Sequence, residues 1–240
     1  TVATEMYSAG IDRLTHQPLS FSVSETTEGV HIHIIDAELM GKGEKEKKDL
    51  YIEGVQNNGI INHYEYIINS EGTIEIRHVL KPEGKMPLWF PRIGLTLTVS
   101  DALDQVKWYG RGPQENYPDR KTGYPMGIYA STVQAMYEPY LMPQDYGLRT
   151  DVRWLQLTTD KGIGLQFKMN EWFNFNIYPY STDNLTKAMY TYQLQKQKGM
   201  TLNLDYATTG VGCTARGVFG AYKAMPQEYR RTISIRPMMK

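Results

Sequence analysis

The sequence predicts an all-β fold, a large antiparallel two-sheet sandwich with one short helix, and three observations support it. Apolar and polar residues alternate with a period of two in several segments, which is typical of strands with one buried face. Turn sequences separate these segments, as in EG at 28, NNG at 57 and DKG at 160. The 4 Trp, 18 Tyr and 6 Phe residues suit sheet surfaces and a sandwich core.

Seven segments show this alternation. In chain order they are VHIHIID (30–36), HYEYIIN (63–69), TIEIRHVL (73–80), IGLTLTV (93–99), VRWLQLT (152–158), TLNLDY (201–206) and RTISIRP (231–237). Because turns rather than helical segments join them, we expect antiparallel meanders and not βαβ units. The mixed-charge run MGKGEKEKKD (40–49) follows the first segment, and we expect it to be a solvated loop without function.

The segment 181–192 has a helical period instead. Its possible N-terminal caps are Ser181, Thr182 and Asp183. Its apolar residues, spaced i, i+3, i+4 and i+7, are Leu185, Ala188, Met189 and Tyr192. We therefore expect one short helix in this segment.

Composition narrows the class of protein. The chain has 240 residues, with 26 Lys plus Arg and 26 Asp plus Glu, so it lacks the basic field that binds nucleic acid. Its apolar runs are far shorter than the roughly 20 residues that span a bilayer, so no membrane partner is expected. Cys213 is the only cysteine and leaves the compartment, cytoplasmic or periplasmic, open. Without repeats or linkers, residues 1–240 are expected to form a single domain, and the start at Thr1 suggests a piece of a longer protein.

Two histidines are candidates for metal binding. His31 and His33 lie two residues apart on one expected strand and therefore share a face, a geometry that a metal could use. However, Val30, Ile32 and Ile34 occupy the opposite, core-facing side, so we expect the histidines on the solvent side. The sequence predicts no metal site and no cofactor for this chain.

Two pairs of acidic residues are candidates for glycoside hydrolysis, Glu115 with Asp119 and Glu138 with Asp145. Such catalysis needs two carboxyl groups about 5 to 5.5 Å or about 6.5 to 9.5 Å apart, and spacing within a loop fixes neither distance. The alternative is that these acids satisfy backbone N–H groups and pair with cations in ordered loops. The candidate cations are Arg111, Arg120 and Arg149.

Three longer motifs carry a family resemblance. They are WYGRGPQENYPDRKTG (108–123), MYEPYLMPQDYGLRTDVRW (136–154) and LNLDYATTGVG (202–212). In order and separation they resemble the C-terminal β-sandwich domain of the lac-type β-galactosidases of glycoside hydrolase family 2. The resemblance implies a supersandwich of the galactose-mutarotase-like type. It also implies that the chain is a C-terminal fragment of a larger multidomain glycosidase. It also implies that the catalytic glutamates lie in a separate (β/α)8 barrel, so that this chain alone is inactive.

The resemblance also implies partners and site residues. The partners are the catalytic barrel of the parent, the carbohydrate substrate and, for the parent, further copies of itself. In the family a tryptophan after the GVG turn packs against the sugar; counting without a gap places Gly217 there, next to Arg216, whereas the aromatic-Gly-Ala step places Phe219. We prefer Phe219 because a ring can stack on a hexose, the alternative being an ordinary core aromatic.

The first motif is expected to be a rigid signature loop that shapes the domain and docks it against the barrel. Its residues are Arg111, Glu115, Asn116, Asp119 and Arg120, with ion pairs between the two arginines and the two acids. Two other functions stay open: a free-standing carbohydrate-binding module and a mutarotase-like epimerase. An exposed groove with Trp and Tyr would favour the module, and a His near a carboxylate in a pocket would favour the epimerase.

Overall fold

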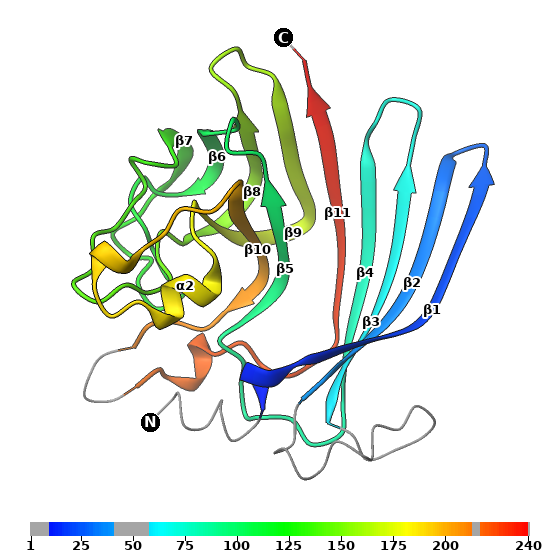
Figure 1. The fold of residues 1–240 in the computed structure, drawn as a ribbon, viewed down its shortest axis with the longest axis horizontal. Coiled ribbons are helices and arrows are strands. Elements are labelled where there is room, and N and C mark those ends of the chain that lie inside the picture. The colour runs from blue at the N-terminus through cyan, green and yellow to red at the C-terminus, as the bar shows by residue number, and fades with distance from the viewer. Residues whose placement is uncertain (1–9, 41–57, 213–216, 240) are drawn as a thin grey trace.

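The computed structural model describes residues 10–40, 58–212 and 217–239, which form eleven strands, one α-helix and three short 3₁₀ helices (Figure 1). In chain order these are η1 (Ile11–Arg13), β1 (Thr15–Thr26), β2 (Gly29–Leu39), β3 (Gly59–Ile68), β4 (Ile74–Glu83), β5 (Arg92–Val99), β6 (Gln105–Arg111), β7 (Met126–Thr132), β8 (Arg149–Thr158), β9 (Gly164–Tyr178), α2 (Thr182–Lys187), η3 (Thr191–Gln193), β10 (Met200–Thr208), η4 (Gly220–Tyr222) and β11 (Tyr229–Met238). The predicted all-β class is confirmed.

The strands form one branched antiparallel sheet. Its main path is β1-β2-β3-β4-β11-β9-β8-β6-β7, and β10 joins β9 to β5 off this path. The branch lies in β9, whose residues 164–169 pair with β11 while residues 174–178 pair with β10. One strand therefore belongs to both layers of the sandwich.

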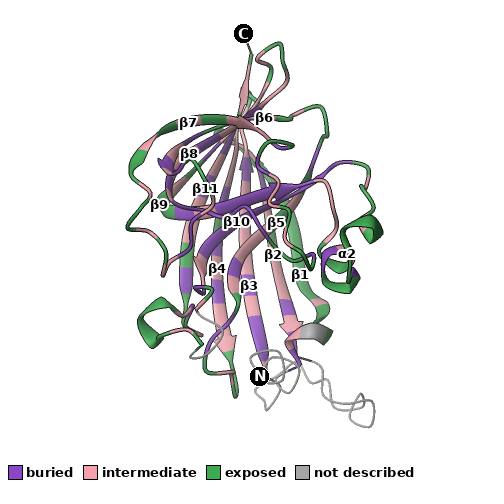
Figure 2. Ribbon diagram, turned by 90° about the vertical axis from the view of Figure 1, so that its left-hand side faces the viewer, coloured by how far each residue is buried: buried purple, intermediate pink, exposed green. Residues whose placement is uncertain are grey.

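The hydrophobic core lies between these layers. In Figure 2, β5 and β10 cross in front of β2, β3 and β4, and β10 is buried over most of its length. Ile76 and Leu80 of β4 share one buried cluster with Leu202 and Leu204 of β10. Burial of this apolar area is the main favourable contribution to folding.

All seven segments with period-two alternation are strands in the structure: β2, β3, β4, β5, β8, β10 and β11. The alternation predicted none of the strands β1, β6, β7 and β9. In β9 the buried side chains of Phe167 and Phe173 lie at odd-numbered positions. Glu171 takes an odd-numbered position and Trp172 an even-numbered one, so the alternation is interrupted at the centre of the strand. The edge strand β1 is exposed almost throughout and contains Pro18, which suits only an edge position.

The predicted helix exists but is shorter than its apolar spacing indicated. The Ser181 side chain caps α2 by accepting a hydrogen bond from the Asn184 N–H, as expected. Leu185 and Ala188 are buried, whereas Met189 and Tyr192 are exposed, so half of the expected apolar face is wrong. The Gln193 side chain accepts hydrogen bonds from the N–H groups of residues 189 and 190, which replaces further helical pairing.

The histidines of β2 differ in exposure. His33 is exposed as expected, but His31 is only 9% exposed, so its expected solvent position is wrong. The Glu65 carboxylate of β3 lies 3.4 Å from His31 and contributes to this burial. The mixed-charge run 40–49 lies outside the described residues apart from Met40, which is buried. Within the described ranges, no helix has the length and apolarity to cross a bilayer.

Candidate functional site

A groove opens where three neighbouring strands depart from regular pairing. In the β8–β9 ladder Trp154 pairs with Lys168 but Val152 pairs with Phe173, so residues 169–172 bulge out of that ladder. In the β10–β5 ladder the register shifts between Asp205 and Ala207. Bulges bend strands and re-aim side chains, and here they turn polar groups toward one space.

The groove has a volume of about 570 Å³ and is open to solvent. It is lined by Pro118, Lys121, Asp151, Asn170, Glu171, Trp172, Asn174, Tyr206, Ala207, Thr208, Ala221, Tyr222, Lys223, Ala224 and Arg231. These residues come from the signature loop, three bulged strands, η4 with the segment after it, and β11. Mixed charge and aromatic rings give the groove the chemistry of a site for a polar, uncharged ligand.

Asp151 is the charged centre of one wall. Its φ of 56° is the only left-handed value among the described non-glycine residues, and it places the carboxylate between two cations. Arg111 Nε and Lys121 Nζ each lie 2.5 Å from one of its oxygens. Burial works to raise the pKa of Asp151, but the hydrogen bonds from Lys121 and Arg111 outweigh it and hold this pKa below its ordinary value.

A chain of hydrogen bonds connects this wall to the buried floor. Asn174 Oδ1 accepts from the Asp151 N–H, and Asn174 Nδ2 donates to the Thr208 hydroxyl. Thr208 in turn donates to Asp205, a fully buried carboxylate that forms an ion pair with Arg92 at 3.1 Å. The polar side chains of β8, β9 and β10 are therefore held by one another, which fixes the shape of the groove.

Two aromatic side chains are exposed at the groove. Trp172, on the β9 bulge, is 56% exposed, and the Arg153 guanidinium lies 4.0 Å from the centre of its ring. Tyr222 is 40% exposed. Exposed rings beside polar groups can stack on the apolar face of a sugar.

The segment 217–224, which we call the rim, borders the groove. Phe219 precedes η4 and is 71% exposed, so it is not the core aromatic that one interpretation of the sequence allowed. Backbone bonds anchor the rim, since the Gly210 N–H donates to the Tyr222 carbonyl and Phe90 forms a bridge with Ala224. Gly217 is exposed with a φ of 63°, and Arg216 lies outside the described residues.

The signature loop is ordered by hydrogen bonds, but its expected ion pairs are wrong. Glu115 accepts from the hydroxyls of Tyr117 and Tyr140 and, at 2.8 Å, from the Gly147 N–H. Arg111 pairs with Asp151 of β8 instead. Neutral donors inside the fold satisfy Glu115 without the entropy of fixing a second long charged side chain.

Asp119 connects the loop to the segment that follows β10. Its carboxylate accepts from the N–H groups of Val211 and Gly212 at 3.1 and 2.6 Å, and Arg120 donates to the Gly212 carbonyl. A Cβ on Gly210 would lie 2.4 Å from the Asp119 carboxyl carbon, so only glycine permits this approach. The expected role of acids as acceptors for backbone N–H groups is confirmed here.

The remaining loop residues are structural in their contacts. Asn116 is fully buried, and its side-chain oxygen accepts from both the N–H and the hydroxyl of Thr150. Arg149 donates to the carbonyls of Pro113 and Gly147, not to an acid. Asp145, in the second motif, accepts hydrogen bonds from the side chains of Arg92 and Asn176.

Several groove residues were not found from the sequence. Asp151 lies 21 positions before Trp172, and Arg231 follows 59 positions later, so the three carry no joint spacing signal. The one available signal was in the strand 164–178, where Glu171 takes a position that the alternation reserves for an apolar residue and Trp172 takes a polar one. An outward tryptophan in a sheet is uncommon without a use.

Comparison with known proteins places these features in context. Residues 6–235 match the family described as the β-galactosidase small chain. A β-galactosidase of Priestia megaterium is 38% identical over 147 residues, which is 61% of this chain and 14% of that protein. A β-galactosidase of Vibrio cholerae is 31% identical over 207 residues, which is 86% of this chain and 18% of that protein. The chain thus spans less than a fifth of these relatives.

One solved structure is also similar. A GalM/aldose epimerase homologue from C. elegans aligns with 92% of this chain and 69% of its own, with a TM-score of 0.45 and 12% sequence identity.

Proposed function

This chain belongs to the family of the β-galactosidase small chain, and we propose that it is the accessory, non-catalytic C-terminal domain of a larger β-galactosidase-like glycoside hydrolase. In this proposal the parent hydrolyses terminal β-linked galactose or a related sugar. The chain completes the substrate pocket and docks against the catalytic barrel. The short matched region supports this proposal, because it makes up 14% and 18% of the two relatives and the rest of each relative lies outside the match.

The observation that carries the proposal is the exposure of Phe219 on an anchored rim. A phenyl ring that is 71% exposed gains little from its own fold, yet backbone hydrogen bonds with Gly210 and Phe90 hold its segment in place. A ring held in this way can stack on the apolar face of a hexose at low entropic cost. Phe219 is therefore the residue through which the chain would contact the substrate.

A second surface supports docking. Leu141 and Met142 are 95% and 56% exposed, and they follow Tyr140, whose hydroxyl is held by Glu115 of the signature loop. Exposed apolar side chains on a fixed loop are typical of surfaces that another protein unit covers. We propose that the catalytic barrel of the parent covers this surface.

A free-standing carbohydrate-binding module is the second candidate, favoured by the exposed rings of Trp172 and Tyr222 at the groove. An epimerase is less well supported, because no histidine is among the residues that line the groove. The first two candidates differ in whether the isolated chain binds sugar by itself.

The test is Phe219→Ala in the full-length parent. We expect a several-fold rise in the Michaelis constant, because one stacking face is worth roughly 0.5 to 1.5 kcal/mol, with little change in thermal stability. Phe21→Ala is the matched control, since Phe21 is 68% exposed on β1, outside the rim. An unchanged Michaelis constant for Phe219→Ala, or an equal rise for both variants, would contradict the role of the rim.

The isolated chain provides the complementary measurement. With a chromogenic β-galactoside we expect no turnover above a buffer blank, and with galactose we expect no saturable heat in calorimetry. Turnover that survives repurification would overturn the non-catalytic role. Saturable galactose binding without turnover would favour the binding module instead.

A further inference from the structure

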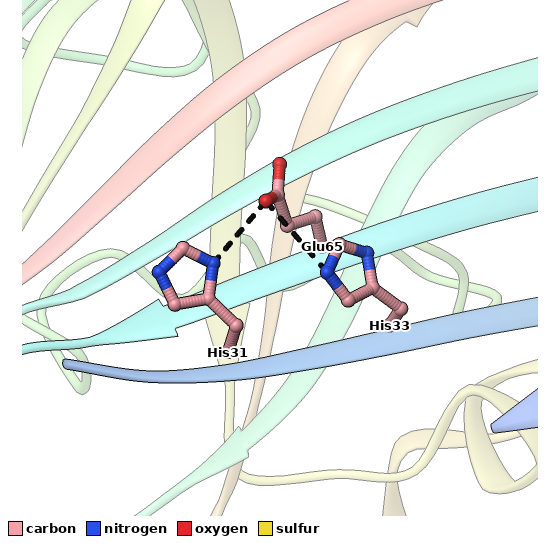
Figure 3. A group of neighbouring side chains, drawn as sticks. All are labelled: His31, His33 and Glu65. Atoms are coloured by element: carbon pink, nitrogen blue, oxygen red, sulfur yellow. Dashed lines mark hydrogen bonds and ion pairs between the residues drawn. The ribbon is translucent and has the colours of Figure 1, made fainter. Parts of the chain in front are cut away.

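Two histidines and a glutamate converge on the sheet face opposite Ile32 and Ile34, and none of the three lines the groove (Figure 3). His31 and His33 share this face because they lie two apart on β2. The register pairs His33 directly with Glu65 of β3, so Glu65 stands beside both rings.

One carboxylate oxygen is the point of convergence. Glu65 Oε1 lies 3.4 Å from His31 Nδ1 and 3.9 Å from His33 Nε2, and the two dashed lines in Figure 3 meet at this atom. One potential ligand atom from each residue lies within 4.8 Å of the other two. A metal ion with ligand bonds of about 2.0 to 2.2 Å needs only small side-chain movements to join such a triangle.

The surroundings keep this oxygen available. Arg77 Nη1 binds the other oxygen, Glu65 Oε2, at 3.1 Å, which fixes the carboxylate and leaves Oε1 directed at the imidazoles. On the far side of His31, Glu28 Oε2 lies 4.0 Å from Nε2, a buried nitrogen without a hydrogen-bond partner. A carboxylate there can accept a hydrogen bond from Nε2–H when Nδ1 binds a metal, which is the usual support for a ligating histidine.

We propose that His31, His33 and Glu65 form a binding site for a divalent transition metal, with Zn²⁺ as the best-fitting ion. Two imidazole nitrogens and one carboxylate oxygen suit Zn²⁺ in type and number, and they leave a fourth position for water. The site bridges β2 and β3 across the plain ladder of the sheet. The ion is therefore expected to stabilise this half of the fold, because it binds the folded arrangement only.

A second cluster, on β1 and β2, provides an internal control. His16 of β1 lies 3.0 Å from Asp36 and 3.7 Å from Glu38, so it offers one imidazole and two carboxylates. The His16 side chain is 64% exposed, against 11% for His31. With a single nitrogen ligand and greater exposure, this cluster is the weaker site for Zn²⁺.

The experiment is calorimetric titration of the untagged, chelator-treated full chain with ZnCl₂, together with Co²⁺ as a spectroscopic probe. We expect saturable binding of one Zn²⁺ per chain, the visible absorption of low-coordinate Co²⁺, and a higher melting temperature with Zn²⁺. Absence of saturable Zn²⁺ binding overturns the proposal.

Variants locate the ion. His33→Ala should weaken Zn²⁺ binding by more than about tenfold, since loss of even an outer partner of a ligand costs about 10- to 100-fold. His16→Ala should leave the affinity within about twofold. Glu65→Gln, which keeps an acceptor for Arg77, is the second variant if His33→Ala fails to fold. Binding that survives both site variants, or that is lost equally in His16→Ala, overturns the assignment.

Discussion

The β1–β4 ribbon and the bulged strands β8, β9 and β10 use the same antiparallel pairing to different effect. Across β2, β3 and β4 the register runs without a shift, and polar side chains meet their direct cross-strand neighbours. The β8–β9 and β10–β5 ladders contain register shifts, and polar side chains from distant segments meet around a groove. A regular ladder brings together side chains that are direct cross-strand neighbours, whereas bulges turn side chains from several elements toward one site.

The two regions also differ in burial. In the bulged region Phe175 is fully buried and meets Trp108 edge-on, with ring centres 5.9 Å apart. In the ribbon, Phe21 of β1 is 68% exposed. The bulged region therefore contributes most of the apolar packing on which the fold depends, although it is the less regular of the two.

The largest predicted effect tests this difference. Phe175→Ala should lower the free energy of unfolding by about 3 to 5 kcal/mol, because it leaves a cavity in a packed core. Phe21→Ala should change it by less than about 0.5 kcal/mol, because its ring is mostly in water. Denaturant unfolding of both variants at neutral pH measures the contrast, and losses of similar size would show that the ribbon is packed as tightly as the bulged region.

The next prediction concerns His78, which joins the two regions. This β4 side chain is 2% exposed, and its Nδ1 lies 2.7 Å from the hydroxyl of Tyr206, the bulge residue of β10. Its Nε2 lies 3.0 Å from Asn62 Oδ1, so the neutral ring satisfies both contacts. Burial lowers the pKa of His78 to about 4, and the charge of His63 adds to this effect.

The sign of the pH dependence follows from this shift. The pKa is lower in the folded state, so the stability contributed by neutral His78 is present above about pH 6.5 and is lost as the pH falls toward about 4. The expected loss over this range is about 3 kcal/mol. Unfolding measured from pH 7 to pH 4 should show a shallower decline for His78→Gln, and parallel profiles would contradict a buried neutral histidine.

The smallest predicted effect sharpens the role of the bulge at Asp151. Asp151→Asn removes the charge that Arg111 and Lys121 share but tolerates a positive φ, and it should cost about 1 kcal/mol. Asp151→Ala also removes the short polar side chain whose local hydrogen bonds let Asp and Asn tolerate a positive φ, which should add about 1 to 2 kcal/mol. Equal losses in denaturant unfolding would show that the backbone at residue 151 relaxes without cost.

The sequence by itself determined the strand content and much of the local chemistry. Seven strands followed from period-two alternation, because a strand with one buried face needs that pattern whatever its partners are. The Ser181 cap was also readable, since it depends only on residues within one turn. In the same way, His31 and His33 had to share a face, because two residues separate equivalent positions of a strand.

Only the tertiary structure decided what meets across the chain. Glu65 stands beside the two histidines because the register of β2 and β3 places it there, and register depends on the whole sheet. Arg111 pairs with Asp151 and not with the signature-loop acids, because the bulged strand β8 directs the Asp151 carboxylate toward it. Pro118 and Arg231 line one groove although 113 positions separate them in the sequence, and no local pattern records which distant segments the fold brings together.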